Sequence, residues 1–230
     1  MLGGRGGAGA SVLAAAFAVT AAREGMRTLL IDADPIGGGV DLVLGWEEVD
    51  GLRWPGLAET SGRVDPPALV EVLPRVGDLA VLSFDRDDAF LAPAEAMATS
   101  LDAGRRGRDL VVVDLPRHLD DAAVIALSAA DRAFLLVPME LRACAAAARV
   151  AAVAGQHCLS LALVVRGPSP GGLKVTEVVN SVGLPLAGQL RAEPGLARAL
   201  ENGMPPAGDG KGPLATLCRR LLGEIRAQAQ

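Results

Sequence analysis

The chain has 230 residues, a length that suits one α/β domain. Half of its residues are apolar but only 3% are aromatic, so we expect a core of Ala, Leu and Val without aromatic platforms for stacking bases. The formal net charge of −5 disfavours a nucleic-acid partner, because binding to a phosphate backbone needs clustered positive charge. We see no basic leader pattern and no apolar run of ~20 residues, and we therefore expect a cytoplasmic protein with no membrane span.

Apolar runs alternate with helical patterns along the chain, which is typical of βαβ units. The predicted strands span residues 28–32, 79–83, 110–114, 133–138, 160–166 and 186–190. The predicted helices span residues 11–24, 67–75, 92–103, 120–129, 141–154, 173–182, 194–202 and 213–227. The segment 45–64, which contains Trp46, Trp54 and Pro55, is expected to be an irregular insertion. This order predicts a single α/β domain over residues 1–230, with a mostly parallel, doubly wound sheet and helices on both faces.

Residues 4–11 read Gly-Arg-Gly-Gly-Ala-Gly-Ala-Ser, which matches the phosphate-loop (P-loop) spacing G-x-x-x-x-G-K-[ST]. Backbone N–H groups of such a loop cradle phosphates at the start of a helix, and Ser11 keeps the hydroxyl position. Ala10 occupies the lysine position, so the cation that grips the β- and γ-phosphates is missing. The candidate phosphate-binding residues are Gly4, Arg5, Gly6, Gly7, Ala8, Gly9, Ala10 and Ser11.

The same loop has two other interpretations. Gly4, Gly6 and Gly9 match G-x-G-x-x-G, and Asp32 follows at the end of a strand, as in a dinucleotide-binding fold that would serve a nicotinamide-dependent oxidoreductase. The loop could also be a strand-to-helix turn without a ligand. Features further along the chain favour the phosphate loop.

An acidic residue ends each of two predicted strands. Asp114 ends the strand 110–114 in the Walker B arrangement, which places a carboxylate near a magnesium ion held by the Ser11 hydroxyl. Asp32 ends the strand 28–32, and Asp34 and Asp41 flank three consecutive glycines after it. A glycine run between carboxylates suits a loop that reorganises around a γ-phosphate and positions water. The structural alternatives are a strand that simply ends in Asp and a solvated acidic turn.

Together these motifs resemble the MinD/ParA group of P-loop ATPases, whose Walker A motif carries an extra lysine at its front. Arg5 stands at that front position, Ala10 at the second lysine and Ser11 at the hydroxyl. Residues 190–203 resemble the segment by which that group contacts adenine. The loop without its second lysine is closer to the CpaE/TadZ branch. Within that branch, three segments resemble the actinobacterial septum-site-determining proteins, namely 37–42, 51–55 and 62–64.

The resemblance implies catalytic and metal-binding roles for residues that match the motifs. Asp34 would orient the attacking water, while Ser11, Asp32 and Asp114 would organise Mg²⁺. Arg5 could supply part of the lost charge to the facing subunit of a dimer, or it could be a solvated arginine in an exposed loop.

The implied cofactors are ATP or ADP with Mg²⁺, bound weakly. A charge-assisted hydrogen bond contributes about 1.5–3 kcal/mol, so alanine at the lysine position should weaken affinity roughly ten- to hundred-fold. Gly39 also departs from the pattern, because the MinD branch commonly has an asparagine there. The remaining candidate cofactor-binding residues are Arg166, Glu193 and Pro194.

The resemblance therefore implies a degenerate ATP-binding protein with weak or absent ATP hydrolysis. It would act as a spatial regulator or localisation factor for septum site determination or for a Tad-type pilus or secretion machinery. Its partners would be proteins of those machineries, and a homodimer is left open. The alternatives are an active, dimerising ATPase that uses Arg5 in trans, and an NAD(P)-binding oxidoreductase. Because only Met1 and Leu2 precede the loop, we expect most of the first strand to be missing, together with the upstream receiver-like domain that such proteins carry.

Overall fold

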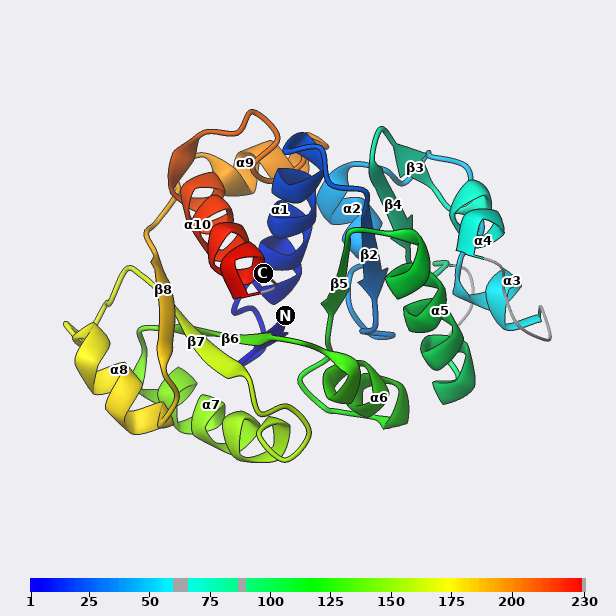
Figure 1. Cartoon of the computed structure of the whole chain (residues 1–230). Coiled ribbons are helices and arrows are strands. Elements are labelled where there is room, and N and C mark those ends of the chain that lie inside the picture. The colour runs from blue at the N-terminus through cyan, green and yellow to red at the C-terminus, as the bar shows by residue number, and fades with distance from the viewer. Residues whose placement is uncertain (60–65, 87–89, 229–230) are drawn as a thin grey trace.

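The computed structural model describes residues 1–59, 66–86 and 90–228 (Figure 1). Its strands are β1 (Leu2–Gly3), β2 (Thr28–Asp32), β3 (Arg75–Val76), β4 (Leu79–Leu82), β5 (Leu110–Asp114), β6 (Ala133–Pro138), β7 (Leu161–Arg166) and β8 (Leu186–Leu190). Its helices are α1 (Ala10–Arg23), α2 (Val40–Leu44), α3 (Trp54–Glu59), α4 (Pro66–Val72), α5 (Ala94–Gly107), α6 (Asp121–Ala129), α7 (Leu141–Ala154), α8 (Val175–Val182), α9 (Leu196–Glu201) and α10 (Gly212–Gln228).

The described strands follow one another across the sheet in the order β3-β4-β2-β5-β1-β6-β7-β8. β1 joins two four-stranded halves, because Leu2 pairs with Leu135 of β6 and also bridges to Leu115, just past β5. The pairings are parallel except that of the edge strand β3 with β4. Since the carboxyl ends of parallel strands share one edge, the loops that leave them gather there. The expected mostly parallel sheet is confirmed.

Each face of the sheet carries its own hydrophobic core. Helices α1 and α10 pack against each other on one face, where apolar residues of α2 join them (Figure 1). Helices α5, α6, α7 and α8 cover the opposite face. Ala, Leu and Val dominate both cores, as the composition predicts. The doubly wound α/β architecture is therefore also confirmed.

Strand β5 is central in the sheet but only partly buried. The two-residue strand β1 lies between β5 and β6 at their carboxyl ends, where the Met1 nitrogen donates to the Val113 carbonyl at 2.7 Å and Leu115 N–H donates to the Met1 carbonyl at 2.8 Å. Towards their amino ends, β5 and β6 line a cavity of about 550 Å³. Leu110 and Val111 remain partly exposed beside this cavity.

Two segments differ from the elements that the sequence predicts. The predicted helix 67–75 ends at Val72, because Pro74 lacks the N–H that a continuing helix would need, and Arg75 lies in β3. The segment 45–64 is not wholly irregular, since α3 begins at Trp54. The Trp54 side chain is fully buried, and its Nε1–H donates to the Asp32 carbonyl at 2.7 Å. The 62–64 part of the resemblance lies outside the described residues.

Candidate functional site

The phosphate loop, residues 4–11, connects β1 to the first turn of α1. The Gly4 N–H donates to the Leu136 carbonyl of β6 at 2.9 Å, and this bond ties the loop to the sheet. A Cβ on Gly4 would lie 2.7 Å from the Ala147 Cβ of α7, so the loop can approach that helix only with glycine here. Gly7 and Gly9 have positive φ angles of 69° and 96°, which glycine adopts without strain.

Helix α1 begins without a side-chain cap. Its N-cap residue is Gly9, and no side chain in the described part of the chain accepts a hydrogen bond from the first turn. The first N–H groups of a helix have no partner within the helix, and the helix dipole places positive potential at the same end. The main-chain part of the expected phosphate cradle is therefore present around Ala10.

Two carboxylates from neighbouring strands lie beside the start of α1. Asp32 and Asp114 are opposite each other in the register of β2 and β5, and each is only 2% exposed. Burial raises the pKa of Asp114 to about 6, and the nearby Ser11 hydroxyl opposes this shift in part. Burial and the facing Asp114 charge raise the pKa of Asp32 to about 7. The structure thus brings together the three residues that the sequence predicts for Mg²⁺.

The donor set fits a magnesium–nucleotide complex. The Oδ1 atom of Asp114 is buried without a hydrogen-bond partner, so a ligand position is free beside Ser11. No group of three or more His, Cys, Asp and Glu side chains among the described residues could hold a metal by itself. Mg²⁺ is usually bound by one or two protein ligands with phosphate oxygens and water completing its octahedron. Ser11 and Asp114 supply that kind of partial site.

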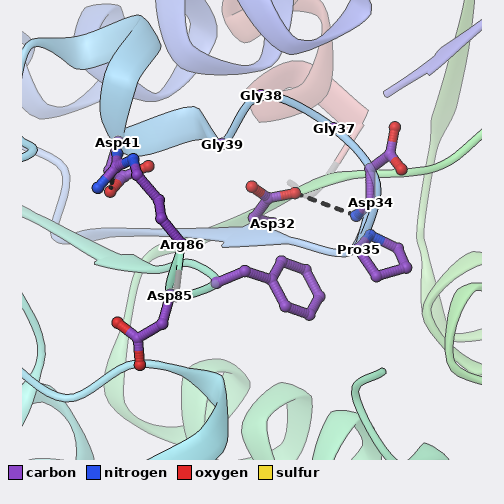
Figure 2. A pocket seen from close by; sticks show the side chains of 10 residues that line it. Asp32, Asp34, Pro35, Gly37, Gly38, Gly39, Asp41, Asp85 and Arg86 are labelled. Carbon is purple, nitrogen blue, oxygen red and sulfur yellow. Dashed lines mark hydrogen bonds and ion pairs between the residues drawn. The ribbon is translucent and has the colours of Figure 1, made fainter. Parts of the chain in front are cut away.

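The acidic loop, defined as residues 32–41, is shaped by Asp32 (Figure 2). One carboxylate oxygen of Asp32 accepts the Asp34 N–H and the other accepts the Val40 N–H, both at 3.0 Å. Asp32 therefore holds both ends of the glycine run, which gives it a positioning function beside the predicted metal site. A cavity of about 360 Å³ opens between this loop and the residues after β4.

Asp34 lies at the edge of the same site. Its carboxylate is turned away from that of Asp32 (Figure 2), and its Oδ1 accepts the Ile36 N–H at 3.3 Å. Its charge contributes to the raised pKa values of both Asp32 and Asp114, so the three carboxylates are close together. The water-orienting function of Asp34 stays a prediction.

The third acid of the loop, Asp41, is buried and ion-paired with two arginines. It is 1% exposed, and its Oδ2 accepts from Arg53 at 2.7 Å and from Arg86 at 2.8 Å. Gly39 has φ 90°, and a Cβ there would lie 2.5 Å from Asp41 Oδ1. A side chain at position 39 would therefore be strained and would crowd the ion-paired Asp41 carboxylate. Neither Arg53 nor Arg86 stands out in the sequence, since both become significant only through Asp41.

The two arginines nearest the phosphate loop differ in their partners. Arg5 donates to both oxygens of Glu140, at 2.8 and 3.0 Å, and to the Gly6 carbonyl at 2.9 Å. Arg166, at the carboxyl end of β7, has its Nη1 3.0 Å from the position that a Cβ on Gly9 would occupy. Sequence reasoning included both residues but had no means of placing Glu140, which precedes α7.

The predicted adenine-contact segment has a structural function at Glu193. The Glu193 Oε2 accepts the Leu214 N–H at 2.8 Å in the first turn of α10, and a Cβ on Gly212 would lie 2.9 Å from its Oε1. Glu193 therefore caps α10. Its negative charge is favourable there, because the helix dipole places positive potential at the N-terminus. Pro194 precedes Gly195, the N-cap of α9, which has φ 82°.

Comparisons with known proteins agree with this geometry. No family model matches the chain. The chain is 48% identical over 227 residues to an uncharacterized protein of Mycobacterium tuberculosis, covering 98% of this chain and 63% of that protein. The chain thus spans less than two thirds of the length of that relative. A Chlorella vulgaris protein that carries the name septum site-determining protein MinD is 25% identical, over 96% of this chain and 83% of its own.

Solved structures share the fold. The ParA family ATPase of Chlorobium tepidum superposes with a TM-score of 0.84 at 16% identity, covering 96% of both chains. The MinD cell division protein of Aquifex aeolicus has a TM-score of 0.77 at 25% identity and covers 96% of both chains, and it has also been solved in a MinC:MinD complex. The Pyrococcus horikoshii septum site-determining protein MinD, complexed with Mg-ADP, has a TM-score of 0.80 at 18% identity, covering 99% and 96%. The structural and distant sequence homologues of this chain are therefore MinD/ParA P-loop ATPases.

None of the helices in the described ranges is long and apolar enough to cross a membrane.

Proposed function

We propose that this chain is a MinD/ParA-like nucleotide-binding domain that binds ATP or ADP with Mg²⁺ weakly and hydrolyses ATP slowly or not at all. The observation that carries the proposal is the Ser11–Asp114 pair, with its unpartnered buried oxygen, beside an uncapped helix start that retains every phosphate-loop residue except the lysine. When bound, Mg²⁺ would neutralise charge on the phosphate oxygens. Ser11 and Asp114 would hold it, and Asp32 would fix the acidic loop.

Isothermal titration calorimetry with ADP and ATP, with and without Mg²⁺, tests this proposal, together with phosphate-release assays. Ala10→Lys restores the missing ammonium and should tighten ATP binding roughly ten- to hundred-fold, since a charge-assisted hydrogen bond contributes about 1.5–3 kcal/mol. Ser11→Ala should remove the dependence of binding on Mg²⁺. Turnover by the natural chain as fast as that of Ala10→Lys would contradict the degenerate site, and no binding by either protein would contradict the nucleotide site.

The proposed biological function is that of a localisation factor for septum site determination or a Tad-type pilus or secretion machinery, within the CpaE/TadZ branch. The MinD names of the relatives and the solved MinC:MinD complex support a domain that acts through protein partners in the cytoplasm. A fluorescent fusion imaged in its native cells separates the two settings. Foci at the division site would support the septum function, and polar foci that coincide with pilus components would support the other. A uniform signal would contradict both.

The alternative of an active dimer that uses Arg5 in trans has one supporting observation. Arg5 precedes the exposed tip of the phosphate loop at Gly6 and Gly7, where a facing subunit could reach it. Within one chain, however, Arg5 is neutralised by Glu140. In an ATP-dependent dimer, Arg5 would have to leave Glu140 and bind a phosphate of the nucleotide in the facing subunit.

The nicotinamide alternative requires Asp32 to accept hydrogen bonds from ribose hydroxyls. Both Asp32 oxygens already accept main-chain N–H groups of the acidic loop. This occupancy supports the phosphate-loop interpretation. If the protein quenches NADH fluorescence and added ATP does not reverse the quenching, the nicotinamide interpretation would be preferred to the phosphate loop.

A further inference from the structure

The site lacks a positive charge at Ala10, which another cation of the chain would have to replace. The two lysines, Lys174 and Lys211, are exposed at the starts of α8 and α10. Arg53 and Arg86 are bound to Asp41, and Arg5 is bound to Glu140. Each of these arginines therefore already has a carboxylate partner.

Arg166 differs from these three arginines in having no carboxylate partner among the described residues. Its guanidinium is partly buried and makes no side-chain hydrogen bond or ion pair within the described part of the chain. It lies against the main chain of Gly9, the residue from which α1 begins. A cation without a carboxylate partner is available for an anionic ligand, and the N–H groups of the helix start beside it attract the same ligand.

The sheet fixes the position of Arg166 relative to the phosphate loop. Gly3 pairs with Leu136 of β6, and Leu136 pairs with Val164 of β7. Arg166 is two residues beyond Val164 and therefore points to the same face of the sheet. Val164 packs in the core beneath α1, so Arg166 emerges from that face at the carboxyl edge, where α1 begins. Its own carbonyl accepts the Met139 N–H at 2.9 Å, which holds this end of β7 to the chain after β6.

We propose that Arg166 supplies, from strand β7, the positive charge that the phosphate loop lacks at Ala10, and that it binds the phosphate groups of a nucleoside di- or triphosphate. This inference rests on the proposed nucleotide-binding function. A guanidinium is planar and binds phosphate through two parallel hydrogen bonds, whereas an ammonium is a compact point charge. Arg166 thus contributes affinity for phosphates from the flank of the loop without reproducing the lysine's position, as the proposed binding with weak hydrolysis requires.

The test compares Arg166→Gln with the natural chain, with Ala10→Lys and with the double variant. Arg166→Gln should weaken ADP and ATP binding about ten- to hundred-fold, the loss expected for a charge-assisted hydrogen bond. It should change AMP binding less, and it should flatten the salt dependence of ADP affinity. In the Ala10→Lys background the same substitution should cost less than about threefold, because the lysine then supplies the charge. Arg166→Lys should retain most of the affinity.

The matched control is Arg149→Gln, which removes an exposed arginine from α7, on the opposite face of the sheet, and should leave affinity unchanged. If Arg166→Gln binds ATP as tightly as the natural chain, or if only the Ala10→Lys proteins bind it, Arg166 is not the replacement cation. If neither the natural chain nor Ala10→Lys binds a nucleotide, the proposed function itself fails.

Far-ultraviolet circular dichroism and thermal melting of each variant separate loss of affinity from loss of fold. Arg166→Lys keeps the test valid if the glutamine variant is unstable.

Discussion

The phosphate loop and the acidic loop meet at the same edge of the sheet, but they depend on side chains to different extents. The phosphate loop offers main-chain N–H groups, and its glycines are needed for backbone conformation and close packing. The acidic loop depends on Asp32 and Asp41, whose carboxylates are buried and bound by named partners. A cradle made of main chain can lose its lysine and keep its shape, whereas the acidic loop could not lose a carboxylate in the same way.

The largest expected effect is the loss of Asp41, which would break the side-chain framework of the acidic loop. Asp41→Ala should reduce the free energy of unfolding by about 3–5 kcal/mol, because it leaves Arg53, only 10% exposed, without its buried partner. Urea denaturation measures the change. The control is Asp85→Ala, which removes a half-exposed carboxylate that pairs with the same arginine and should cost less than about 1 kcal/mol. Equal losses would show that the buried pair is not the main support.

The raised pKa values of Asp32 and Asp114 predict an unusual pH dependence of stability in the absence of divalent cations and nucleotide. Between the ordinary carboxyl pKa and the folded values of about 7 and about 6, the folded chain binds more protons than the unfolded chain. Stability from these groups is therefore fully present below the ordinary carboxyl pKa and is lost progressively as pH rises from there to 6 or 7, by on the order of a few kcal/mol.

Chemical denaturation between pH 4 and pH 6 measures this slope, below the range in which the Met1 amine, whose pKa burial lowers to about 6, contributes with the opposite sign. Asp114→Asn should reduce it, because the amide does not ionise. Asp109→Asn is the control. The hydrogen bond from Arg27 lowers the Asp109 pKa to about 2, so Asp109 changes the stability only at pH values below this window. A slope that Asp114→Asn leaves unchanged would mean that the buried carboxyls do not titrate there.

A smaller change tests the main-chain cradle. Gly9→Ala forces a side chain onto φ 96° and should cost about 1–2 kcal/mol of stability. Gly25→Ala imposes similar strain at φ 77°, where a Cβ would meet no atom within 4 Å, and should cost about the same. Calorimetry should show that only Gly9→Ala loses ADP binding. Equal ADP affinities in the two variants would argue against phosphate binding at the helix start.

The smallest effect is expected from Arg5→Ala. The Arg5–Glu140 ion pair is about one third exposed, and exposed pairs contribute roughly 0–1 kcal/mol. We expect nearly unchanged thermal stability and nearly unchanged ADP affinity of the monomer. Light scattering with ATP and Mg²⁺ tests the alternative in which Arg5 acts on the nucleotide of the facing subunit. Loss of an ATP-dependent dimer on substitution would support that function of Arg5, and an unchanged dimer would exclude it.

Local patterns in the sequence predicted most of the fold. Alternating apolar strands and amphipathic helices are set by residues close in the chain, so β2, β5, β6 and β8 have the predicted bounds. The short helix α3 was not predicted, because Trp-Pro-Gly has the composition of a turn. Tertiary contacts stabilise it, including burial of Trp54 and the hydrogen bonds from Trp54 to the Asp32 and Ser83 carbonyls. The pair Ser11 and Asp114 was predicted, since parallel strands bring their carboxyl ends to one edge.

The sequence by itself determined the phosphate loop, the missing lysine and the acids at the ends of two strands, because each is a short motif with fixed local geometry. Only the tertiary structure decided which cation is available to that loop. Arg5 belongs to the loop but is neutralised by Glu140, which is 135 residues away in the chain, while Arg166 comes from β7 and has no carboxylate partner in the described structure. Whether a charge is free depends on its neighbours in space, and the sheet register brings those neighbours from distant parts of the chain.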